Sequence, residues 1–247
     1  MQSACTVEAA RIELAPNGIL RVALNHANFL LVTAPAPDAA GVAADLGRAL
    51  AQSLNAEPRF VGFENAGLAA DAAAHDAWDV AFIGADPARA SEIVSSDPYV
   101  EIEATYLVPP GSRLRTIADV DAPGIRIASA RRSAYDLHLE RGLRAAQLVR
   151  ADSIPASFDL FRREGLDALA GLRAGLLQDQ ERLPGSTVLD GQFMRVRQAI
   201  GTRRSCPAGA QHVASFVRSA IGAGMVGRLI ADHGIRGVMV AAERSLP

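Results

Sequence analysis

The sequence has no lysine, because all 25 of its basic residues are arginines. A Schiff-base or pyridoxal enzyme needs a lysine amine, and the phosphate-binding P-loop needs a lysine beside the phosphates. Both classes of protein are therefore excluded. The formal net charge of −2 gives no chain-wide basic field, which argues against nucleic acid as the main partner.

Cysteine is also scarce. Cys5 and Cys206 are about 200 positions apart and have neither CxxC nor metal-site spacing, so a disulfide and two free thiols both stay open. The five histidines are scattered, with no metal-ligand spacing and no serine–histidine–acid grouping. We therefore assign no catalytic residue, no metal ligand and no cofactor from the sequence.

Long hydrophobic runs are missing as well. No window approaches the ~18 continuous apolar residues of a membrane span, and the N-terminus has no basic start followed by an apolar run. We expect a soluble protein, from which a leader was removed or which is made without one. The length of 247 residues and the hydrophobic content of 49% fit one large α/β domain or two lobes.

What the sequence does contain is an alternation of short apolar strands with helical patterns. Strands are expected at 19–25, 59–63, 79–84, 124–129, 148–152 and 166–171, and helices at 41–55, 68–78, 133–147, 157–165 and, as a pair broken at Gly222–Gly224, 207–234. This order predicts βαβ units with a parallel sheet. Ligands of such sheets bind beyond the carboxyl ends of the strands.

A first candidate anion site follows the expected strand 79–84. Asp86 and Pro87 are typical of a helix start, as the N-cap and the first helical residue. Arg89 follows one turn later, and its planar guanidinium is well matched to a carboxylate. The alternative is a purely structural cap beside a surface arginine.

A second candidate lies in ASARRSAYD, residues 128–136, where Ser133 and Asp136 fit a capping box. Free backbone amides and the helix dipole at such a start favour an anion, and the Ser133 hydroxyl adds a donor. The alternative is a plain cap beside solvated Arg131 and Arg132. Two such helix starts, in separate βαβ halves, suggest that one small anionic ligand is held from two sides.

Five segments in this order carry a family resemblance: NGILRVALN, GVAADLGRALAQSLN, DVAFIGADPARASEIVSSDPY, GIRIAS with SAYD, and GLDALAG. Over roughly residues 15–236 the chain resembles an extracellular solute-binding protein of the polar amino-acid type, the ligand-capturing component of ABC importers. The resemblance implies an α/β type II periplasmic-binding-protein fold with a central ligand cleft and two hinge crossings. Residues 1–105 with 196–247 would form lobe one, and 106–195 lobe two.

The resemblance also implies site residues. Arg89, beside Gly84 and Asp86, would hold a ligand carboxylate, and the start of the lobe-two helix would add Arg132, Ser133 and Ala134. Phe29 and Phe63 match the places of two aromatic residues that sandwich the ligand, although core packing is an equal reading of Phe63. Asn25, Asn28 and Tyr135 are candidate polar contacts, or turn and packing residues.

Three departures from the family pattern affect the ligand. Val42 and Ala43 follow Gly41 in place of a bulky residue and an acid, and Ala130 and Arg131 replace a glycine–threonine pair. The acid that receives the ligand's amino group in the family falls near Gly171–Arg173, where this sequence has GLRAG. If Arg173 replaces that acid, the ligand is expected to carry a second acidic group; the alternative is that Arg173 lies on an outer surface.

From the residues and the resemblance together we expect a monomeric binding protein without catalysis. Its partners would be a small anionic or zwitterionic ligand and, if the protein is exported, ABC permease subunits. The resemblance implies a periplasmic location, and synthesis without a leader would instead indicate a cytoplasmic sensor or carrier. A dehydratase acting on a cyclohexadienyl acid is the enzymatic alternative, with Glu64 and Glu103 as the candidate acids.

Overall fold

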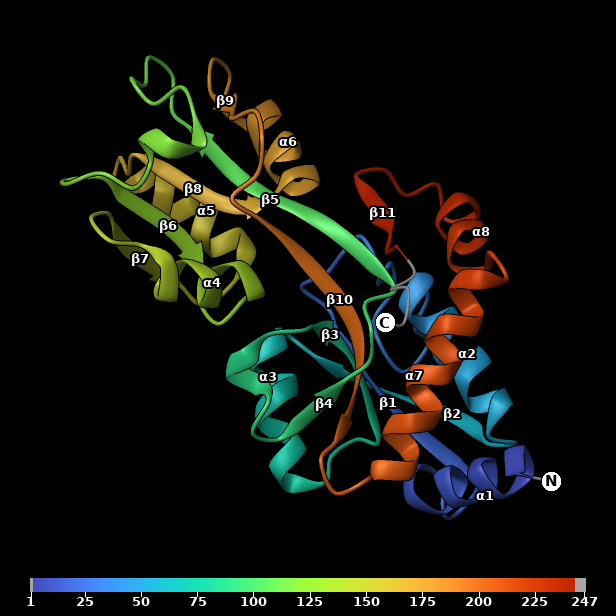
Figure 1. Cartoon of the computed structure of the whole chain (residues 1–247). Helices are drawn as coiled ribbons and strands as arrows, with labels where there is room; N and C mark the ends of the chain where they lie inside the picture. The colour runs from blue at the N-terminus through green and yellow to red at the C-terminus, as the bar shows by residue number, and fades with distance from the viewer. Residues whose placement is uncertain (1, 243–247) are drawn as a thin grey trace. The chain divides into compact units, whose positions relative to one another are not determined.

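The computed structural model describes residues 2–242, with side chains from residue 7 onward. The chain forms two compact units (Figure 1): unit 1 contains Met1–Glu101 and Arg197–Pro247, and unit 2 contains Ile102–Val196. In the described part, no single helix has the length and apolar character needed to cross a membrane. By length and composition alone, the pair Pro207–Gly222 and Met225–Asp232 passes that test together, with a bend of 68°.

Unit 1 is built on a sheet in which parallel strands meet an antiparallel neighbour. Its strands are β1 (Ile19–Asn25), β2 (Glu57–Phe63), β3 (Val80–Gly84), β4 (Ile93–Ser95), β11 (Val238–Val240) and part of β10 (Met194–Arg203). β1 is parallel to both β2 and β3, and β10 is antiparallel to β3 and β4. The predicted parallel arrangement of the first three strands is confirmed.

Helices cover both faces of the unit 1 sheet. They are α1 (Gln2–Leu14), α2 (Val42–Ser53), α3 (Ala66–Asp71), α7 (Pro207–Gly222), α8 (Met225–Asp232) and the 3₁₀ helices η1 (Ala72–His75) and η2 (Pro87–Arg89). In Figure 1, α3 lies on one side of the strands, and α2, α7 and α8 lie on the other. All five residues of β3 are buried, as expected for a strand covered on both faces.

The α3 face of the sheet packs around the only tryptophan of the sequence. Trp78 is fully buried against alanines of α3 and residues of β1 and β3, and its indole N–H donates to the Ala69 carbonyl at 2.8 Å. The predicted single helix 68–78 is wrong, because the chain changes from α3 to η1 and then turns at Asp76, which has a left-handed φ of 52°.

The start of α2 depends on a glycine. Gly41 has φ 110° and ψ 171°, and a Cβ atom on it would lie 2.5 Å from the Leu31 carbonyl oxygen. We predict that Gly41→Ala lowers the free energy of unfolding by about 1–3 kcal/mol. An alanine is strained at this positive φ, and its Cβ would contact backbone atoms that cannot easily move away. Urea denaturation measures this loss, with Gly142→Ala, where a Cβ meets nothing within 4 Å, as the control. Equal stability of the two variants would contradict the prediction.

Unit 2 is a smaller α/β unit. Its strands are β6 (Arg126–Ala130), β7 (Gln147–Ala151), β8 (Ala168–Leu172), β9 (Thr187–Val188) and most of β5 (Val100–Val108); its helices are η3 (Ile117–Asp119), α4 (Ala134–Gly142), α5 (Ile154–Arg163) and α6 (Arg173–Arg182). β6 is parallel to β7 and β8, and β5 is antiparallel to β8 and β9. The core joins Phe158 and Phe161 of α5 to Leu107, Ala128 and Leu169 of the sheet.

The expected helix 133–147 ends early, at Gly142. The carboxylate of Asp121 accepts hydrogen bonds from the backbone N–H groups of Arg144, Ala145 and Ala146 at 2.9–3.0 Å. These amides therefore cannot continue the helix, and the same hydrogen bonds lower the pKa of Asp121. The contact joins residues more than 20 positions apart, so local periodicity gives no sign of it.

Candidate functional site

The first candidate element lies where β3 ends. Asp86 caps η2 as predicted, since its carboxylate accepts from the Ala88 N–H at 2.8 Å. Pro87 is the first residue of η2, and Arg89 is its last. Arg89 is only 7% exposed, and its Nη1 donates to the Gly84 carbonyl at the end of β3. The alternative of a surface arginine is therefore wrong.

A buried guanidinium is costly unless anions or hydrogen-bond acceptors compensate it. An arginine guanidinium keeps its charge at every physiological pH and carries five N–H donors in a flat fork, a geometry that can bind a carboxylate with two parallel hydrogen bonds. In Arg89 the Gly84 carbonyl already accepts from Nη1. The 3₁₀ turn and the bond to Gly84 fix the side chain at the carboxyl end of β3. The arrangement can therefore orient an anion at this end of the sheet.

The turn after β1 reaches the same edge of the unit 1 sheet. Because Leu24 is in register with Phe82, the residues after β1 lie level with the end of β3. Asn25 accepts from the Ala27 N–H at 3.1 Å and so has a turn role. Asn28 is buried, and its side-chain oxygen has no hydrogen-bond partner among the residues that the structure describes. This oxygen is an acceptor that a ligand N–H or O–H group could satisfy.

The two aromatic candidates have different surroundings. Asn25 is in register with Phe63, which places Phe63 at the same edge. Its ring is partly buried against the Trp78 cluster, so packing accounts for at least part of its role. Phe29 lies next to Asn28 in the turn and is half-buried.

The second candidate element lies in unit 2, between β6 and α4. Ser133 caps α4 by accepting from the Asp136 N–H at 3.1 Å. In a capping box, the Asp136 carboxylate would accept from the backbone N–H of Ser133. It accepts instead from the N–H of Arg132, at 2.9 Å. Arg132 has a left-handed φ of 59°, and the Ser133 N–H donates to the Ala130 carbonyl at 3.2 Å.

Asp136 also holds this helix start to the sheet. It is 1% exposed, and its carboxylate accepts from Arg150 Nε of β7 at 2.9 Å. Ala134, the first residue of α4, is buried beside it. The loop 131–134 is thereby fixed at the carboxyl end of β6, where the N-terminus of α4 favours an anion.

Two buried hydroxyls lie in the same part of unit 2. Ser129 is on β6 and Tyr135 is in the first turn of α4, and within the described residues neither hydroxyl makes a hydrogen bond of good geometry. The Ser133 side chain is the polar neighbour of the Tyr135 hydroxyl. Burial raises the pKa of Tyr135, so its hydroxyl stays protonated and can donate. Sequence patterns gave no sign of Ser129, because a serine inside an apolar strand looks like any small core residue.

Arg173 is partly buried and is paired with a carboxylate, so the alternative of an outer-surface position is wrong. Its Nε donates to Glu103 Oε2 of β5 at 2.7 Å, its Nη1 donates to the Leu189 carbonyl at 3.3 Å, and its Nη2 donates to the Gly191 carbonyl. The Arg173 side chain is 23% exposed. Its charge is therefore compensated within unit 2.

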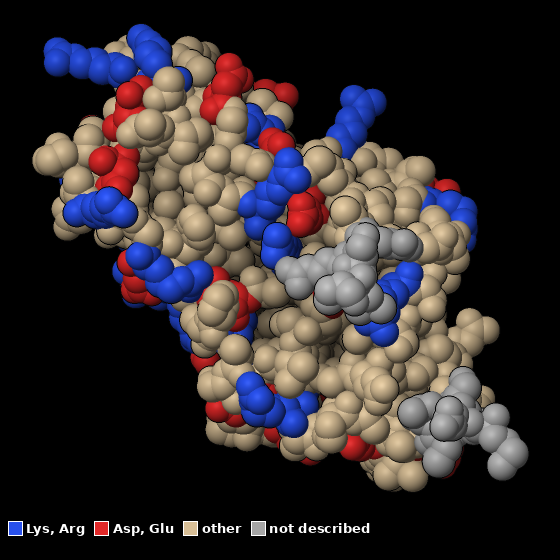
Figure 2. Space-filling view, in the orientation of Figure 1, with Lys and Arg blue, Asp and Glu red and all other residues tan. Residues whose placement is uncertain are grey.

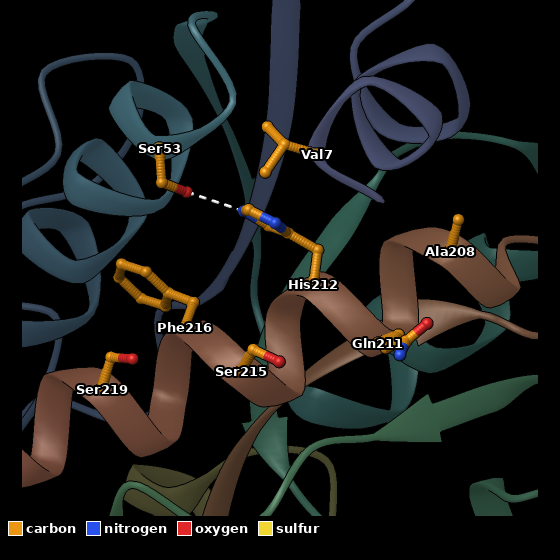
Figure 3. Close-up of a pocket in the computed structure, with 8 residues that line it drawn as sticks. All are labelled: Val7, Ser53, Ala208, Gln211, His212, Ser215, Phe216 and Ser219. Atoms are coloured by element: carbon orange, nitrogen blue, oxygen red, sulfur yellow. Dashed lines mark hydrogen bonds between the residues drawn. The ribbon is translucent and has the colours of Figure 1, made fainter. Parts of the chain in front are cut away.

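A separate pocket of about 360 Å³ lies among α1, α2 and α7 of unit 1 (Figure 3). Its lining is uncharged: Val7, Ser53, Ala208, Gln211, His212, Ser215, Phe216 and Ser219. His212 Nε2 lies 2.8 Å from Ser53 Oγ, and burial lowers the pKa of His212, which favours a neutral ring. None of the predicted ligand contacts is among these residues.

On the face shown in Figure 2, basic and acidic side chains lie close to one another at several places. No group of three or more His, Cys, Asp or Glu residues in the described part could hold a metal ion. Cys206 is a buried free thiol, and the side chain of Cys5 lies outside the described residues.

No family model and no curated protein matches this sequence. Solved structures do resemble the fold. A mutant of ArgBP from T. maritima has a TM-score of 0.73 and 21% sequence identity, over 90% of this chain and 98% of that one. AncCDT-1, an ancestral amino acid-binding protein and precursor of cyclohexadienyl dehydratase, has a TM-score of 0.73 and 18% identity, over 89% and 95%.

A third structure is AbpA from Streptococcus pneumoniae, an amino acid ABC transporter substrate-binding protein bound to L-arginine. It has a TM-score of 0.72 and 17% identity, over 89% of this chain and 95% of that one. At these identities the likeness establishes the fold. The chain has the fold of the two-lobed type II periplasmic binding proteins, as the sequence predicted.

Proposed function

Starting from the type II periplasmic-binding-protein fold, we propose that this chain binds a small carboxylate-bearing solute, an amino acid or a related organic acid, as the substrate-binding component of an ABC importer. The observation that carries the proposal is Arg89, a buried guanidinium fixed at the carboxyl end of β3. Parallel sheets bind ligands at this end. Asn28, with its unpartnered amide oxygen at the same edge, supports the assignment.

The start of α4 is proposed as a separate anion-binding element of unit 2. The backbone amide of Ala134, the Ser133 hydroxyl and the helix dipole favour a carboxylate there. Tyr135 is a candidate donor from this element. Phe29 and Phe63 are proposed to contact the apolar part of the ligand, and Gly84 and Asp86 to position Arg89.

The permease partner and the periplasmic location rest on the fold resemblance, and the proposed activity is binding without catalysis. Because AncCDT-1 is described as a precursor of cyclohexadienyl dehydratase, a dehydratase activity is the second candidate function. A general acid for such chemistry would have to be placed beside the ligand. Glu64 is exposed, and Glu103 is paired with Arg173, so neither residue has a feature that favours this role.

We predict that at least one free acid raises the melting temperature of the protein. The panel consists of the 20 L-amino acids, their 2-hydroxy acids and C4–C5 dicarboxylates, measured by thermal shift and then by calorimetry. A ligand present at 100 times its Kd adds about 2.7 kcal/mol of stability by mass action. The control for each binder is its carboxamide, which cannot form the charged pair with Arg89. The proposal fails if no acid shifts the melting temperature, or if acid and amide bind equally.

A further inference from the structure

The pocket of about 360 Å³ in unit 1 is bounded by residues of α1, α2 and α7 (Figure 3). Some of its lining residues are half-buried: Val7, Ala208, His212 and Phe216. The others are polar and exposed: Ser53, Gln211, Ser215 and Ser219. A cavity of about 150 Å³ is large enough for one benzene molecule. The pocket therefore has room for a substituted aromatic ring.

The two rings of the pocket lie on one face of α7. His212 and Phe216 are four residues apart, which places them one turn from each other on the same side of the helix. Figure 3 shows both rings projecting from α7 toward α2. Aromatic rings attract one another in offset-stacked and edge-to-face arrangements. A flat ligand that packs against Phe216 would therefore bring a ring substituent close to His212.

The contact between Ser53 and His212 fixes the tautomer of the imidazole. Ser53 has one hydroxyl proton, which it donates to the Leu50 carbonyl at 2.7 Å. Ser53 Oγ can therefore only accept from His212 Nε2, which lies 2.8 Å away. Nε2 then carries the hydrogen, and in a neutral ring Nδ1 is an acceptor. Burial lowers the pKa of His212, so the ring is mainly neutral at pH 7.

The lining disfavours ions. Among the described residues, no charged side chain lines the pocket. A carboxylate or an ammonium group would lose hydration there without gaining a counter-charge. A phenol has a pKa of about 10 and is uncharged at pH 7. It combines an aromatic ring with one O–H donor, which matches the ring of Phe216 and the acceptor of His212.

We propose that this pocket is a second ligand site, which binds an uncharged phenol whose hydroxyl donates to His212 Nδ1 and whose ring packs against Phe216. Ser53 is a positioning residue, because it holds His212 in the tautomer that accepts at Nδ1. The site is independent of the proposed carboxylate-binding function, since none of the proposed carboxylate contacts lines the pocket.

The test compares 4-ethylphenol with its isomer 4-methylanisole, which has the same atoms but no O–H group, by NMR titration of the backbone amides. In the wild-type protein we expect the phenol to bind about fivefold more tightly, the effect of one neutral hydrogen bond, with shifts centred on α1, α2 and α7. In His212→Leu we expect both isomers to bind equally. His75→Leu is the matched control, because His75 is exposed on η1 and does not line the pocket.

The histidine ring nitrogens supply a second readout that needs no variant. In protein labelled with ¹⁵N-histidine, 4-ethylphenol should shift the acceptor nitrogen of one histidine, and 4-methylanisole should not. The charged analogue 4-ethylbenzoate should cause no shifts in the three helices that line the pocket.

Several results would overturn the proposal: equal binding of the two isomers by the wild-type protein, a preference that persists in His212→Leu, or shifts centred on other parts of unit 1. Binding of 4-ethylbenzoate in the pocket as tightly as the phenol would also overturn it. If neither isomer binds, the phenol site is wrong and the proposed carboxylate-binding function is unaffected. Retained affinity for 4-methylanisole shows that His212→Leu is folded.

Discussion

Replacing Arg89 by alanine is expected to weaken binding of the carboxylate ligand by about 2–5 kcal/mol, which is roughly 30-fold to several thousand-fold in Kd. The guanidinium is buried and donates to the Gly84 carbonyl, so under the proposed function it is held in one orientation toward the carboxylate. Its removal leaves a ligand carboxylate in a partly dehydrated site with one charged partner fewer. Calorimetry with the best acid of the panel measures the loss.

The matched control is Arg59→Ala. Arg59 lies on β2 in the same unit and is exposed, so its loss tests the effect of net charge alone. We expect less than a threefold change in Kd for this variant. Unchanged binding by a folded Arg89→Ala variant would remove the arginine from the site, and with it the main support for the proposed function.

Replacing Asp79 by alanine is expected to lower the free energy of unfolding of unit 1 by about 3–5 kcal/mol. Asp79 is 3% exposed, and its carboxylate accepts from the Arg21 N–H at 2.7 Å, from Arg21 Nε at 3.0 Å and from Arg21 Nη2 at 2.7 Å. Arg203 also lies close, with Nη2 at 3.7 Å. The variant leaves both guanidinium groups without their buried counter-charge.

Chemical denaturation measures this effect, and Asp76→Asn is the control, because asparagine tolerates the left-handed backbone of residue 76 and removes only the charge. Asp76 pairs with the same two arginines, but its side chain is 63% exposed, so we expect a loss of no more than about 1 kcal/mol. The hydrogen bond from Arg21 lowers the pKa of Asp76 from 3.8. Its contribution is therefore present above pH 3.8 and is lost as the pH falls through the folded-state value. Equal losses in the two variants would contradict the distinction between them.

Both helix starts were predictable because their signals are local. A cap joins residues two or three positions apart, so Asp86 with Ala88, and Ser133 with Asp136, can be identified without knowledge of the fold. The strands of the parallel sheet were predictable for a similar reason, since each is a short apolar run bounded by turn residues. The burial of Arg89 was not predictable, because exposure depends on what the rest of unit 1 packs around it.

The long-range pairs were not predictable from any pattern. Glu103 and Arg173 are separated by 70 positions, and Arg21 and Asp79 by 58. Seen alone, each is a charged residue beside a strand, and the sequence accordingly left two readings of Arg173 open: a partner for an acidic ligand group, or a residue on an outer surface. The antiparallel register of β5 and β8 gives it a partner inside the protein.

The sequence by itself determined the βαβ pattern, the two capped helix starts and the exclusion of lysine chemistry, because these depend on residue type and short spacing. Only the tertiary structure decided which charges are buried, which are paired and which remain available to a ligand. Pairing and burial arise when distant strands come into register, and their energies depend on the water that the fold removes.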